Sequence, residues 1–162
     1  MLFNDNDFEQ FYECVKDLLA SPQVCAMEEI PQHKAGISCL DHSVFVAYVS
    51  FRICRLFGWN YAAAARGGLL HDLFLYDWRQ KGSHEGRHAF THPKAALRNA
   101  TAAFRLNEIE KDSIEKHMWP VTWHRPRYKE SFAVNLADTL CAAAEVLYIY
   151  RFMKVGRRLA WQ

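Results

Sequence analysis

Residues 61–73 of the chain are YAAAARGGLLHDL. Its alanines and leucines are interrupted by one charge before the end, and Asn60, directly before it, is a good helix N-cap. These residues predict a short apolar helix. It ends in the adjacent pair His71 and Asp72, two polar residues that close an otherwise apolar segment.

Segments on both sides carry apolar residues at three- and four-residue spacing, which is typical of amphipathic helices. Helices are expected over residues 7–20, 38–57, 92–105, 107–117 and 131–154, and a polar connection with Pro22, Pro31 and Gly36 follows the first of them. Gly58 is a good stop for the helix before it, and Pro93 suits a first helical position. Asn107 and Glu110 form the pattern of a capping box.

Two stretches lack a steady hydrophobic period and are expected to be long loops. The first covers residues 74–91, and the second is WPVTWHRPRY, residues 119–128. No segment shows the alternation of a β-strand. The sequence therefore predicts one all-α domain over residues 1–162, a helical bundle with about six main helices and two long loops.

The composition excludes several classes of protein. Hydrophobic residues make up 51% of the 162 residues, which excludes a disordered or fibrous chain. Twenty Lys and Arg against eighteen Asp and Glu give a net charge of +2, so strong nonspecific nucleic-acid binding is not expected. No apolar run approaches the roughly 20 residues of a membrane span, and the acidic start MLFNDNDFEQ is unlike a secretory signal. We expect a cytoplasmic protein with reduced cysteines, because the five cysteines are odd in number and lack metal-site spacing.

Polar residues in two expected helices break the apolar pattern. His42 shares a helix face with Val46 and Val49, and Asp138 shares one with Cys141. An ionised carboxylate in such a position must be paired or coordinated. Each case alone has a plain explanation, since a core histidine is usually hydrogen-bonded and a buried aspartate often caps a helix or pairs with an arginine. Together with the His-Asp pair, they indicate a metal site.

In this order, the residues resemble the pattern of the HD-domain superfamily of metal-dependent phosphohydrolases. The pattern is a histidine, an adjacent His-Asp pair and a distant aspartate, here His42 in DHSVFVA, His71 and Asp72 in GGLLHDL, and Asp138 in VNLADTL. The resemblance covers residues 36–150. It implies an HD-type helical bundle in which these four residues bind a metal ion.

Two further histidines resemble those of the subset that holds two metal ions: His92 in THPKAA and His117 in IEKHMWP. The resemblance implies that they bind a second ion and that Asp72 bridges the two. One or two divalent transition ions are expected, since mixed imidazole and carboxylate ligands suit Fe, Mn, Zn, Co or Ni. Alternatively, His92 is a helix-capping or loop residue, and His117 is a cation at a helix C-terminus.

Candidates for catalysis and substrate binding lie around these ligands. Asp72 and His124, the latter as a proton donor, are the expected catalytic residues. Arg87 and His88 belong to the loop over residues 74–91, which would cover the site, and Lys94 would meet a phosphate. For the charged residues, the alternative is an ordinary solvated surface.

The resemblance implies a phosphohydrolase that cleaves a phosphoester or phosphoanhydride bond in a nucleotide or another small phosphorylated molecule. One departure is that the segment HDLFLYDW lacks the lysine that many members carry shortly after the His-Asp pair. The alternatives are a catalytically silent metal- or nucleotide-binding regulatory module and a structural metal domain. A homodimer is also open, since the aromatic residues near the carboxyl terminus belong either to a dimer surface or to the core: Tyr148, Tyr150, Phe152 and Trp161.

Overall fold

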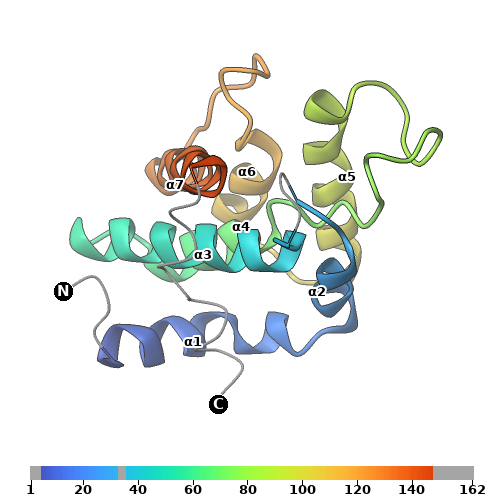
Figure 1. The fold of residues 1–162 in the computed structure, drawn as a ribbon. Helices are drawn as coiled ribbons and strands as arrows, with labels where there is room; N and C mark the ends of the chain where they lie inside the picture. The colour runs from blue at the N-terminus through green and yellow to red at the C-terminus, as the bar shows by residue number, and fades with distance from the viewer. Residues whose placement is uncertain (1–4, 33–35, 148–162) are drawn as a thin grey trace.

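The computed structural model describes residues 5–32 and 36–147. Over these residues the chain is helical, with no strand beyond an isolated bridge between Pro31 and Ser38, which confirms the expected all-α class. In chain order the helices are α1 (Asp5–Leu19), α2 (Pro22–Cys25), the 3-10 helix η1 (Ala26–Glu29), α3 (Cys39–Leu56), α4 (Tyr61–Leu70), α5 (His88–Ala103), α6 (Glu108–Lys116) and α7 (Lys129–Val146) (Figure 1).

Helix α4 is the centre of the bundle. It contacts α1, α3, α5, α6 and α7, and its residues Leu69 and Leu70 are fully buried. Gly67 and Gly68 permit this close approach: a Cβ atom on Gly67 would lie 2.8 Å from the Ser113 Cβ of α6, and one on Gly68 would lie 2.9 Å from the Ala47 Cα of α3. The glycines bring two neighbouring helices against the end of α4, where the His-Asp pair lies.

Helix α3 crosses the molecule between α1 on one side and α5, α6 and α7 on the other (Figure 1). It begins with a capping box between Ser38 and Asp41 and ends before Gly58, whose positive φ of 65° closes the helix as expected. Aromatic rings join it to α1, since the Phe11 ring lies 5.3 Å from the Tyr48 ring between centroids. This packing leaves the other face of α3, with His42, toward α7.

The prediction of a polar connection without helices after the first helix is wrong in part. The chain there forms α2 and η1, because the Ser21 side chain caps the backbone N–H of Val24 and Pro22 occupies the first helical position. Gly36 remains outside any helix, with a positive φ of 92°.

The expected start of α5 at residue 92 is also wrong. The helix begins at His88, so Pro93 lies inside it and not at its first position. The extra turn forms because the Phe90 and Thr91 backbone N–H groups bond to the Arg87 carbonyl, while the His88 ring stacks on Trp78. As a consequence, the first irregular stretch ends at residue 87.

Helix α7 begins at Lys129, two residues before the expected start, and is described to Val146. The rest of the expected helix, up to residue 154, lies outside the described residues, as do Tyr148, Tyr150, Phe152 and Trp161. No helix in the described part of the chain has both the length and the apolar composition needed to cross a membrane.

Candidate metal centre

The structure brings all six expected ligands into one cluster. They come from five places in the bundle: His42 from α3, His71 and Asp72 from the end of α4, His92 from α5, His117 from the end of α6, and Asp138 from α7. The four imidazoles and Asp72 are buried, and the Asp138 side chain is 16% exposed. Two overlapping groups, His42 with His71 and Asp138, and His71 with Asp72 and His117, place one ligand atom each within 4.8 Å of one another. This buried cluster could hold a metal ion.

The Asp72 carboxylate stands between two sets of histidines. Its Oδ2 atom lies 3.4 Å from His71 Nε2 and 4.0 Å from His42 Nε2. Its Oδ1 atom lies 3.3 Å from His92 Nε2 and 3.7 Å from His117 Nε2. Each oxygen therefore faces a different pair of imidazoles, which is the arrangement that a bridging carboxylate requires.

Asp138 completes the first set. Its Oδ1 atom lies 3.0 Å from His42 Nε2 and 3.7 Å from His71 Nε2. It reaches this position from α7 because it shares the inward face of that helix with Val134 and Cys141, both buried.

Backbone carbonyls fix the orientation of three imidazoles. The Nδ1 atoms of His71, His92 and His117 lie 2.7, 2.8 and 2.8 Å from the carbonyls of Gly68, His88 and Ile114. His71 and His117 are the C-caps of α4 and α6, where the last carbonyls of a helix are free to accept. Because a carbonyl only accepts, Nδ1 carries the proton and a neutral ring presents the Nε2 lone pair to the cluster.

Two observations test whether the residues fit a metal ion. The Nε2 atoms of His92 and His117 are 2.8 Å apart, and in neutral rings with Nδ1 protonated both would be lone-pair acceptors, which repel unless a cation lies between them. In addition, His71 Nε2 and Asp72 Oδ1 are buried without a hydrogen-bond partner, although buried polar atoms are normally satisfied. A cation among these atoms would resolve both conflicts, so the residues fit.

The electrostatics of the cluster favour ionised acids. Burial would raise the pKa of Asp138, but the hydrogen bond to His42 and the charges of the neighbouring histidines together outweigh it and bring the pKa to about 2. Burial would likewise raise the pKa of Asp72, but the neighbouring imidazoles of His71 and His92 outweigh this effect and hold the pKa well below its usual value. Both carboxylates are therefore negatively charged at neutral pH, as ligands must be.

The pKa values of His42 and His117 are shifted in opposite directions. Burial and the neighbouring charges of His71 and His92 lower the pKa of His117 to about 3. Burial would also lower the pKa of His42, but hydrogen bonds to Asp138 and Glu145 outweigh it and raise the pKa to about 10. In the absence of metal, His42 therefore holds a proton at neutral pH, between two carboxylates.

Sequence reasoning missed two residues that contact the ligands. Glu145 Oε1 lies 2.7 Å from His42 Nδ1, and the Gln32 side-chain amide donates a hydrogen bond of 2.8 Å to Asp72 Oδ2. Glu145 was visible in principle, because it is the one acid besides Asp138 in the stretch FAVNLADTLCAAAEVL, seven residues after Asp138 and on the same helix face. Gln32 lies in an irregular connection, where the sequence carries no such signal.

The residues expected to bind substrate or to donate a proton have few or no contacts with the six clustered residues. The His88 ring is half-buried and stacks on the His92 ring, with centroids 4.6 Å apart, and Tyr76 Oη lies 3.2 Å from its Nδ1. Arg87, Lys94 and His124 are exposed, and in the described structure no hydrogen bond, ion pair or ring contact joins them to the six clustered residues. Of the four, His88 therefore has the closest connection to the cluster.

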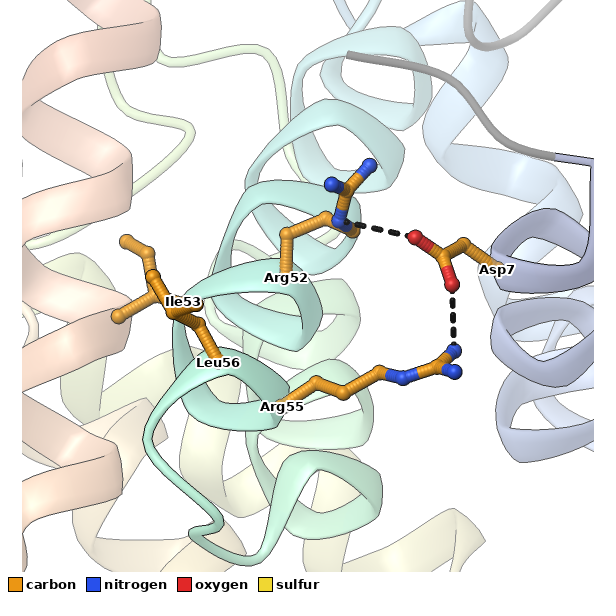
Figure 2. Close-up of a pocket in the computed structure, with 5 residues that line it drawn as sticks. All are labelled: Asp7, Arg52, Ile53, Arg55 and Leu56. Atoms are coloured by element: carbon orange, nitrogen blue, oxygen red, sulfur yellow. Dashed lines mark ion pairs between the residues drawn. The ribbon is translucent and has the colours of Figure 1, made fainter. Parts of the chain in front are cut away.

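A separate surface pocket lies between α1 and α3, lined by Asp7, Arg52, Ile53, Arg55 and Leu56. Figure 2 shows Asp7 between the two arginines; its oxygens lie 3.3 Å from Arg52 Nε and 2.7 Å from an Arg55 guanidinium nitrogen. These ion pairs tie α1 to α3. None of the five lining residues belongs to the metal cluster.

Comparison of the chain with protein families, with curated proteins and with solved structures found no match.

Proposed function

We propose that the chain is a metal-dependent phosphohydrolase of the HD-domain type. It would cleave a phosphoester or phosphoanhydride bond in a nucleotide or another small phosphorylated molecule. The observation that carries this proposal is the position of Asp72, whose two oxygens face two separate pairs of buried imidazoles.

Two groups of residues would hold the ions. His42, His71, Asp72 and Asp138 would bind one, and His92 and His117 would bind the other and share Asp72. Imidazole nitrogens with carboxylate oxygens suit Fe, Mn, Zn, Co or Ni better than Mg alone. When bound, two such divalent ions supply an activated water and positive charge for the phosphoryl oxygens.

The chain's own residues prepare the site for an anionic substrate. Asp72 and Asp138 bring two negative charges, fewer than the four positive charges of two divalent ions, so the loaded centre would attract phosphate. The backbone carbonyls of Gly68, His88 and Ile114 hold three imidazoles in the ligating tautomer. Burial of the imidazoles excludes water and strengthens each electrostatic interaction.

Substrate recognition is assigned to residues around His92. The His88 ring, stacked on His92 and on Trp78, would form one wall of the substrate site. Arg87 and Lys94, exposed beside the same end of α5, would meet phosphate oxygens beyond the reacting group. His124 stays a predicted proton donor, and its exposed position requires the connection after α6 to move toward the substrate.

Asp72→Asn tests the proposal directly. The variant should lose hydrolysis of an aryl phosphate by at least about 100-fold, because the amide cannot carry the charge of a bridging carboxylate. The measurement is steady-state hydrolysis of the aryl phosphate and of a nucleotide panel, with metal content determined in parallel. Asp77→Asn is the matched control, since Asp77 is five residues away and pairs with Arg79 outside the cluster. Equal activity in the wild type and in Asp72→Asn would exclude the proposal.

The second candidate is a regulatory module that binds metal or nucleotide without turnover. The segment HDLFLYDW favours it, because no lysine follows the His-Asp pair there. A wild-type protein that holds metal but hydrolyses nothing in the nucleotide panel would support this candidate over the enzyme.

A further inference from the structure

We propose that Glu145 is the positioning residue that orients His42 for metal binding and sets the affinity of one of the two ions. The inference rests on the proposed metal centre. Its basis is that His42 lies between two carboxylates of the same helix, with Nε2 3.0 Å from Asp138 Oδ1 and Nδ1 2.7 Å from Glu145 Oε1. Asp138 is on the ligand side of the ring, and Glu145 is on the opposite side.

His42 differs from the other three imidazoles in what fixes its Nδ1 atom. His71, His92 and His117 bond to neutral carbonyls three or four residues earlier in their own segments. His42 bonds instead to an acid 103 residues away, on another helix. The contact with Glu145 therefore depends on the tertiary fold, and it places a carboxylate beside the imidazole.

Glu145 occupies a position that is unfavourable for a carboxylate. Its side chain is fully buried, and its second oxygen, Oε2, has no hydrogen-bond partner in the described structure. It also lies in the last turn of α7, where the helix dipole disfavours a negative charge. The bond from His42 is what compensates for this burial, so any use of the charge acts through His42.

Metal binding gives the charge that use. A carboxylate on Nδ1–H keeps the Nε2 lone pair directed at the metal and makes the nitrogen a stronger ligand. A divalent ion on Nε2 carries twice the charge of the proton that it replaces, so Glu145 stabilises the ion more than the proton. Glu145 is 2.7 Å from His42 but on the far side of the ring from His92 and His117, so its effect should be confined to the ion that His42 binds.

Glu145→Gln in the full chain separates charge from shape. The amide keeps the length of the side chain and an oxygen that accepts from Nδ1–H. In cobalt titrations followed by visible absorption, the variant should bind one of two ions about 10- to 100-fold more weakly and the other unchanged. Glu130→Gln is the matched control, because Glu130 is also buried on α7 but accepts from the Asn60 backbone N–H at the far end of the helix. It should leave both affinities unchanged.

The outcomes distinguish this inference from the proposed function. Two ions with unchanged affinities in Glu145→Gln would overturn the role of Glu145 and leave the metal centre intact. A wild-type protein that binds no cobalt would overturn the metal centre itself, and the role of Glu145 with it. If Glu145→Gln does not fold, Glu145→Asp keeps the charge at a longer distance and should weaken the same single ion. Unchanged binding in that variant would also contradict the inference.

Discussion

The Nε2 atoms of His92 and His117 face each other, 2.8 Å apart. Replacing one of these residues tests whether the pair binds a second metal ion. His117→Ala removes one ligand of the second group and leaves His42, His71 and Asp138 in place. The variant should retain one ion where the wild type holds two, as measured by elemental analysis after gel filtration. His124→Ala is the control, because the exposed His124 should leave the metal count unchanged. Loss of both ions or of neither in His117→Ala would contradict the division into two groups.

The pKa of His42 predicts how the stability of the metal-free protein depends on pH. Asp138 and Glu145 face the ring from α7, and Asp72 and His71 face it from the end of α4. The folded pKa is about 10 and the ordinary value is 6.5. Below pH 6.5 both states hold the proton, and the stabilisation is fully present. Between pH 6.5 and about 10, only the folded state keeps the proton on His42, so the free energy of unfolding falls as the pH rises.

Urea denaturation of the chelator-treated protein at pH 7 and pH 9.5 measures this dependence. The wild type should lose more stability between the two pH values than His42→Asn, which has no proton to lose at this position. An equal change in both proteins would show that His42 does not keep its proton in the folded state.

At the scale of helices, close contact of α4 with α3 depends on Gly68. Alanine inside a helix is ordinarily about 1 kcal/mol more favourable than glycine. Here the added Cβ would lie 2.9 Å from the Ala47 Cα, a backbone atom that cannot move without the helix. Gly68→Ala should therefore destabilise the protein by about 1–3 kcal/mol in denaturation experiments. A stabilised variant would show that α3 and α4 can separate without penalty.

Helix boundaries were predictable where the local sequence decides them. Asn60 caps α4, and Asn107 with Glu110 forms the expected capping box of α6. The start of α5 was not, because its first turn depends on the His88 ring stacking against Trp78, which is ten residues earlier and outside any repeating pattern. Pro93 was misleading because proline is compatible both with the first turn of a helix and with a position shortly after it.

At the scale of the whole molecule, the six clustered residues come from α3, α5, α6 and α7 as well as from the end of α4. Metal binding should therefore stabilise the entire fold and not a single loop. Removing the ions with a chelator should lower the melting temperature by several degrees, since a ligand at about 1,000 times its Kd stabilises by about 4 kcal/mol. Thermal unfolding before treatment, after treatment and after addition of Mn²⁺ or Zn²⁺ checks this. A melting temperature that does not change would mean that the cluster is stable without an ion.

The convergence of the six clustered residues was predictable because their order along the chain resembles the HD-domain pattern, and the structure places them together. The surroundings of the cluster were less predictable. Glu145 and Gln32 contact the cluster across the fold. The positions of Arg87 and His124 depend on irregular segments, and Lys94 lies on α5 with its side chain exposed. Sequence order indicates which residues meet. Of the residues that support them, Glu145 leaves a trace in the sequence as a second acid on an apolar helix face, and Gln32 leaves none.

The most direct test of the proposed metal centre is the number of transition-metal ions per chain in protein purified without chelator. We predict two ions in the wild type, lost on replacement of Asp72, whose oxygens face both groups of imidazoles. A wild-type chain that contains no transition metal, and takes up none when Mn²⁺, Fe²⁺ or Zn²⁺ is supplied, would contradict the proposed metal centre.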